Sequence, residues 1–143
     1  MKVQPSPRVG VIVLVLYLIA FYGVWIILGV DYARIGDDAS TLLKWYFAPL
    51  AAGAVVLVIA ATVLGWWGPA LRENTKAPAW TLITPILMLV LAIVVMTTKD
   101  YSSTTSKMFL FLVLGSLGVG FCEEMATRGL LIVGLRGSMT EGK

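Results

Sequence analysis

Four long apolar segments dominate this sequence, and they constrain its fold more than any other feature. Short polar linkers separate the segments, which cover residues 9–30, 42–67, 79–97 and 108–135. A helix needs about 20 mostly apolar residues to cross the roughly 30 Å of hydrocarbon in a bilayer. The sequence therefore predicts an all-α fold, a polytopic transmembrane helix bundle with four spans.

The composition agrees with a membrane-embedded chain. Hydrophobic residues make up 59% of the 143 residues and charged residues only 13%. Soluble domains have about 45–50% apolar and about 25% charged residues. The high hydrophobicity also excludes a disordered chain. From the length we expect a single transmembrane domain over residues 1–143, surrounded by membrane lipids.

The basic residues lie in the linkers and at the termini, and they form no patch. We therefore interpret the net charge of +3 as a topology signal and expect no nucleic-acid partner. The positive-inside rule slightly favours a multi-pass protein of the cell membrane with a cytoplasmic N-terminus. That orientation places six basic residues inside and four outside, namely Lys2, Arg8, Arg72, Lys76, Arg136 and Lys143 against Arg34, Lys44, Lys99 and Lys107.

Six aromatic residues at the ends of the apolar segments fit the belt that Trp and Tyr form at membrane interfaces. We expect interface anchoring for Trp45, Tyr46, Trp66, Trp67, Trp80 and Tyr101. The first apolar segment is longer than the roughly 7–15 apolar residues of a signal peptide. We therefore expect it to be retained as a signal-anchor span.

The chain contains no histidine and a single cysteine, Cys122. It therefore lacks the commonest general base and the commonest metal ligand, and it cannot form an internal disulfide. No activating base is visible for the thiol, so we expect Cys122 to pack as a small residue. The sequence predicts no cofactor and contains no recognisable set of metal ligands.

The fourth segment carries three ionisable residues inside an apolar run: Glu123, Glu124 and Arg128. An ionised side chain at this depth costs about 2.5–3.5 kcal/mol by insertion scales, and such residues usually have a function. Glu124 precedes Arg128 by four residues, the order that favours an ion pair on one helix face. Glu123 is rotated from Glu124 by about 100° and is left for other partners. Counted from Lys107, Glu123 lies about 24 Å deep.

Five small residues lie on another face of the same segment, spaced three and four residues apart: Gly115, Gly118, Cys122, Ala126 and Gly129. Small residues on one face allow another helix to approach closely. Glu124 and Arg128 fall on roughly the opposite side. Because both sides need partners, we expect further helices, either missing C-terminal helices or a partner helix.

The run Glu123-Glu124-Met-Ala-Thr-Arg128 fits an EExxxR motif and resembles the CPBP family of intramembrane endopeptidases, which includes CAAX prenyl proteases and bacteriocin-processing (Abi) proteins. The apolar residues around the motif, 120–122 and 129–131, also resemble that family. The resemblance implies a fold of about eight spans, of which this chain is the N-terminal half. It implies that Glu123 is the catalytic base that activates a water, supported by Glu124 and Arg128. The implied substrates are membrane-associated peptides or proteins, such as a prenylated CAAX protein or a bacteriocin-like leader.

Two later motifs of the family, FxxxH and an HxxxN-like element, cannot be mapped to this chain. The resemblance therefore implies a truncated endopeptidase that is inactive as this chain alone. Two alternatives stay open. One is a non-enzymatic four-span protein, a subunit or an immunity-like protein, with a structural Glu124–Arg128 ion pair and Glu123 facing a partner helix. The other is a proton or cation pathway, which the absence of charge inside the first three spans disfavours.

Overall fold

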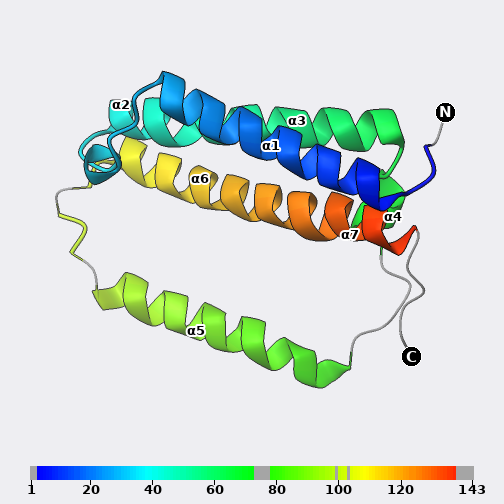
Figure 1. Ribbon diagram of the computed structural model, residues 1–143. Coiled ribbons are helices and arrows are strands. Elements are labelled where there is room, and N and C mark those ends of the chain that lie inside the picture. The colour runs from blue at the N-terminus through cyan, green and yellow to red at the C-terminus, as the bar shows by residue number, and fades with distance from the viewer. Residues whose placement is uncertain (1–2, 73–77, 99, 103, 138–143) are drawn as a thin grey trace. The chain divides into compact units, whose positions relative to one another are not determined.

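A computed structural model describes residues 3–72, 78–98, 100–102 and 104–137, and within them the regular structure is entirely helical (Figure 1). Four helical segments are long and apolar enough to cross a membrane: Pro7–Ile27, Ala39–Leu64, Ala79–Thr98 and Ser106–Arg136. Their limits lie within three residues of the predicted ones. The prediction of an all-α polytopic bundle is confirmed.

The chain divides into two units, residues 1–72 with 106–143, and residues 73–105. The second unit contains the 3-10 turn η3 (Ala79–Leu82) and α5 (Ile83–Thr98), and no residue of α5 is buried. The first unit contains the other three apolar segments. The single domain over residues 1–143 stays a prediction.

The first unit begins with α1 (Pro7–Ile27), whose start is fixed by its sequence. The hydroxyl of Ser6 accepts a hydrogen bond from the amide of Val9 at 3.4 Å, and Pro7 occupies the first turn, where its missing N–H costs nothing. A short 3-10 turn, η1 (Tyr32–Arg34), follows α1. The first span is thus capped at one end and followed by a polar linker.

The second span begins with a capping box at Asp38. Its carboxylate accepts the amides of Ser40 and Thr41 at 2.6 and 2.8 Å, and the Thr41 hydroxyl accepts the amide of Asp38 at 3.2 Å. The span then runs without a break through α2 (Ala39–Thr41), the π-helical η2 (Leu42–Phe47) and α3 (Ala48–Leu64).

The second span ends at Gly65, whose φ of +69° is the left-handed conformation that terminates many helices. The short helix α4 (Trp67–Leu71) follows it. The fourth span runs through α6 (Ser106–Glu124), the π-helical η4 (Met125–Leu131) and α7 (Ile132–Arg136).

Helix directions follow from which residues meet. Gly10 near the start of α1 contacts Gly134 in α7, so the first and fourth spans are antiparallel. Tyr46 and Leu50 of the second span lie against Gly115 and Gly118 of the fourth span, in the same order along both spans, so these two spans run in parallel (Figure 1). The apolar helix α5 lies in the stretch of the chain between α3 and α6.

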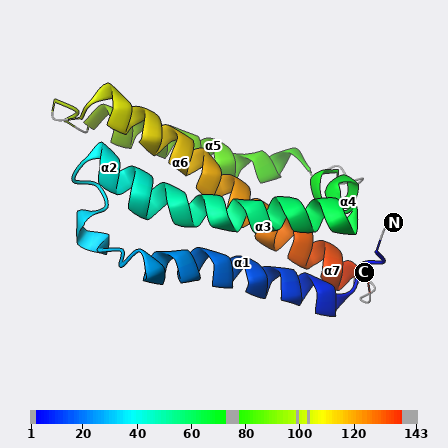
Figure 2. The same cartoon turned by 90° about the horizontal axis from the view of Figure 1, so that it is seen from above.

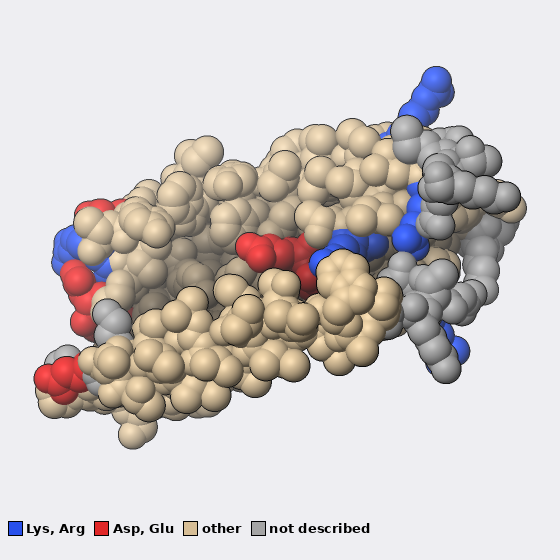
Figure 3. Space-filling model, turned by 90° about the horizontal axis from the view of Figure 1, so that it is seen from below, with Lys and Arg blue, Asp and Glu red and all other residues tan. Residues whose placement is uncertain are grey.

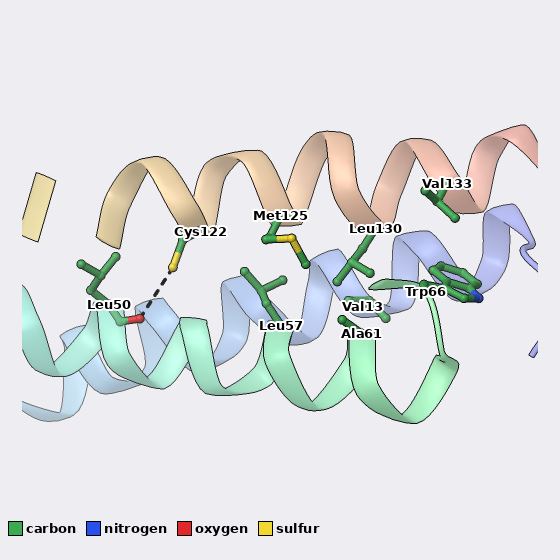
Figure 4. Packing of buried hydrophobic residues seen from close by; sticks show 10 residues of the cluster. Val13, Leu50, Leu57, Ala61, Trp66, Cys122, Met125, Leu130 and Val133 are labelled. Atoms are coloured by element: carbon green, nitrogen blue, oxygen red, sulfur yellow. Dashed lines mark hydrogen bonds between the residues drawn. The ribbon is translucent and has the colours of Figure 1, made fainter. Parts of the chain in front are cut away.

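The core of the first unit lies where these three spans meet (Figure 4). Trp66 is its largest side chain, only 2% exposed, and its indole N–H donates to the carbonyl of Val3 at 2.9 Å. The prediction of an interface anchor is therefore wrong for Trp66, because the turn at Gly65 directs this ring beneath the N-terminal segment. Trp80, by contrast, is 70% exposed.

Candidate functional site

The small residues of the fourth span form its packing face, as predicted. A Cβ added to Gly118 would lie 2.7 Å from the Leu50 side chain, and one added to Gly115 would collide with the ring of Tyr46. Cys122 is buried, and its thiol donates to the carbonyl of Leu50 at 3.8 Å. The glycines therefore let the second span approach α6 closely, and Cys122 packs as a small residue.

The three ionisable residues lie at a change in helix type that α-helical spacing did not predict. Glu123 and Glu124 end α6, whereas Arg128 lies in the π-helical η4. A π-helix bonds each N–H to a carbonyl five residues earlier, and such segments are frequent at functional sites. The amide of Ile132 donates to the carbonyl of Thr127 in this way.

The wider turn of η4 sets which side chains are buried. Buried positions recur at every fourth residue through this region, at Cys122, Ala126, Leu130 and Gly134. Residues midway between them therefore point to the opposite side. Glu124 and Arg128 occupy such positions, and both are exposed.

Glu124 and Arg128 form the predicted ion pair. The guanidinium Nε of Arg128 lies 3.5 Å from a carboxylate oxygen of Glu124, and the two side chains are 76% and 61% exposed. Figure 3 shows acidic and basic side chains side by side among uncharged ones, with the other visible charged side chains toward the ends. The opposite charges of the two side chains neutralise each other, but the helices of the first unit do not cover the pair.

Glu123 has no side-chain partner in the part of the chain that the structure describes. It is exposed, and none of the described residues forms an ion pair or a side-chain hydrogen bond with its carboxylate. Its backbone carbonyl instead accepts the hydroxyl of Thr127 at 2.6 Å. A threonine four residues after a helical residue can make this bond, and that spacing was the available signal for the role of Thr127.

The three residues lie in the interior of the fourth candidate span, Ser106–Arg136. The fourth span has 31 residues, about 46 Å at 1.5 Å per residue, so it exceeds the roughly 30 Å of hydrocarbon. Near the far end of this span, Gly134 contacts Gly10 of α1. Glu124 lies about 15 Å from Gly134 along the helix axis.

The described residues contain no group of three or more His, Cys, Asp or Glu side chains that could hold a metal ion. The chemistry that these residues can supply is therefore that of one free carboxylate beside a neutral ion pair. Comparisons of the chain with models of protein families, with curated proteins and with solved structures found no match. The candidate site stands on the geometry of its own residues.

Proposed function

We propose that this multi-pass membrane protein supplies the carboxylate part of an intramembrane endopeptidase site of the CPBP type. The supporting observation is the carboxylate of Glu123, which has no partner among the described residues and lies next to the neutral Glu124–Arg128 pair inside the fourth candidate span. Arg128 pairs with Glu124, and a carboxylate with a cation as its partner is a poorer proton acceptor. Glu123 is therefore the carboxylate of this site that can accept a proton.

In this proposal Glu123 accepts a proton from a water molecule as the water attacks a peptide carbonyl, which is general base catalysis. The ion pair orients the helix around Glu123, and the hydroxyl of Thr127 bonds the carbonyl of Glu123 where η4 begins. Histidine and asparagine side chains from helices outside this chain complete the site. The substrate is a membrane-associated peptide or protein, and the chain lies in the cell membrane with its N-terminus in the cytoplasm.

The test compares newly formed peptide N-termini in native membranes, which also contain the helices that complete the site, with the chain present as the wild type, as the Glu123→Gln variant or as the Ser116→Ala variant. Ser116 is an exposed hydroxyl residue on the same helix, and its hydroxyl bonds only the carbonyl of Leu112 among the described residues. We expect a set of cleavage products that disappears in Glu123→Gln and persists in Ser116→Ala. Identical products in all three membranes would contradict the proposal.

One observation favours a second candidate, a non-enzymatic membrane subunit. Glu123, Glu124 and Arg128 all lie on the surface of the first unit, where a partner helix with complementary polar groups would cover them. That candidate predicts that Glu123→Gln weakens association with one specific membrane protein and leaves every cleavage product unchanged. The two measurements on the same variant therefore separate the candidates.

A further inference from the structure

A groove runs between α1 and α3, which lie side by side along their length (Figure 2). It has a volume of about 340 Å³ and is lined only by apolar side chains. On α1 these are Val9, Ile12, Val13 and Leu16, whose spacing of three, four and seven residues places them on one helix face. The first wall of the groove is thus a continuous aliphatic stripe.

The second wall comes from the last part of α3. Val56, Ile59, Ala60 and Val63 repeat the same spacing, and Leu64 extends the wall to the end of the helix. Ala60 is the smallest of these side chains, so the groove is roomy beside it. The whole groove lies within two helices that can cross a membrane, and the medium around such a surface is lipid hydrocarbon.

A basic residue precedes the groove at the end formed by Val9 and Leu64. Arg8 directly precedes Val9, it is exposed, and it forms no ion pair with any described acidic residue. Arg72, the residue that follows α4, lies at this same end of the first unit. The described carboxylates of this unit lie in the opposite linker or in the middle of the fourth span. The charge at this end of the groove therefore suits an anion.

Two hydrogen bonds hold the N-terminal segment across the end of α3. The amide of Val3 donates to the carbonyl of Leu64 at 3.2 Å, and the indole of Trp66 donates to the carbonyl of Val3 at 2.9 Å. Arg8 follows this anchored segment after a few residues. Its backbone is thus fixed at the level where the apolar groove ends, which is where a lipid headgroup meets its acyl chains.

We propose that the groove between α1 and α3 binds one acyl chain of an anionic phospholipid, with the lipid phosphate at Arg8. The stretch from Val9 to Leu16 is about 10 Å long, so it holds the part of the chain nearest the headgroup. A guanidinium suits the phosphate because it donates two parallel hydrogen bonds. In this arrangement the acyl chain contacts the apolar walls of the groove, and the phosphate contacts Arg8 at the end of the groove nearest the membrane surface.

The test is native mass spectrometry of the delipidated full chain, titrated with phosphatidylglycerol or with phosphatidylcholine of the same acyl chains. We expect the wild type to retain one phosphatidylglycerol with about fivefold preference, since one basic residue near a membrane surface contributes on the order of 1 kcal/mol. Arg8→Gln should remove that preference, and Arg8→Lys should restore much of it. Arg34→Gln, at the opposite end of α1, should change nothing.

A second pair of variants tests the groove itself. Ala60→Phe places a ring in the groove and should abolish the retained lipid. Ala51→Phe adds the same ring at an exposed position nine residues earlier, on the opposite side of α3, and should not. Equal retention of the two lipids by the wild type would overturn the proposal. So would unchanged binding in both Arg8→Gln and Ala60→Phe, or a dimer of the chain that excludes lipid from this face.

Discussion

At the scale of single residues, the ion pair between Glu124 and Arg128 gives the sharpest test of where the fourth span lies. We predict that Glu124→Gln and Arg128→Gln each destabilise the protein in lipid, and that the double variant recovers part of the loss. Each single change leaves one charge unpaired in a medium of low polarity. A double-mutant cycle from thermal unfolding in nanodiscs should give a coupling above about 1 kcal/mol.

The matched control is the other ion pair among the described residues, Arg34 with Asp37, which joins at 3.3 Å in the first linker. Exposed pairs in water contribute at most about 1 kcal/mol and weaken with salt. We expect a small, salt-sensitive coupling for the linker pair and a larger, salt-insensitive one for Glu124 and Arg128. Two couplings with the same salt dependence would place both pairs in water.

Asp38 makes the stability of the second span depend on pH. The Ser40 hydroxyl, with the amides of Thr41 and Ser40, donates to this carboxylate and holds its pKa below the usual value. A carboxyl whose pKa is lower in the folded state stabilises the fold above its unfolded pKa of about 3.9, and that contribution disappears as the pH falls through the folded value. We predict that the melting temperature of the wild type falls as the medium is acidified below about pH 4.

The Asp38→Asn variant keeps a capping side chain but has no charge to titrate, so it should lose this acid-dependent component. Asp37→Asn, which neutralises the neighbouring carboxylate, should retain it. Thermal melting at a series of pH values measures both. An acid response that is identical in the wild type and in Asp38→Asn would show that other carboxyl groups cause it.

At the scale of helices, Gly10 and Gly134 mark a close backbone approach between the first and fourth spans. A Cβ on Gly134 would lie 2.8 Å from the Cα of Gly10 and 2.9 Å from the carbonyl oxygen of Ser6, and backbone atoms cannot move aside cheaply. We predict that Gly134→Ala destabilises the protein by about 1–3 kcal/mol, measured by thermal unfolding in micelles.

Gly120→Ala is the matched control, because nothing lies within 4 Å of a Cβ added there. Alanine is preferred over glycine inside a helix by about 0.5–1 kcal/mol, so this variant should be neutral or more stable. Both variants replace a glycine of the fourth span with alanine. If Gly134→Ala were as stable as Gly120→Ala, the two helices would not approach as closely as the structure places them.

The helices themselves could be predicted from the sequence because membrane spans need long apolar runs, and the four runs here are unambiguous. The Glu124–Arg128 pair could also be predicted, since a spacing of four residues brings side chains together on one helix face. The π-helical η4 could not, because its wider turn depends on tertiary packing that no local spacing encodes. The burial of Trp66 also depends on distant residues, since its hydrogen-bond partner is the carbonyl of Val3.

At the scale of the whole molecule, the parallel second and fourth spans predict which segments share a side of the membrane. Cysteines replacing Pro5 and Arg72 should react on one side, and those replacing Asp37 and Ser106 on the other, in a Cys122→Ala background. A membrane-impermeant maleimide on intact cells measures this, and a cytoplasmic N-terminus predicts that only the Asp37 and Ser106 positions are labelled. Labelling of Arg72 together with Ser106 would rule out the parallel arrangement.

The contact between Gly10 and Gly134 also joins two segments that are synthesised at very different times. The first span leaves the ribosome early, whereas the residue that packs against its first turn is made almost a whole chain later. At about 5–20 residues per second, the first span waits roughly 6–25 s in the bilayer before that partner arrives. During this interval lipids occupy the surface that the fourth span will cover. The bundle therefore closes by exchanging lipids for a helix, and a ribosome that stalls before Ile132 leaves it open.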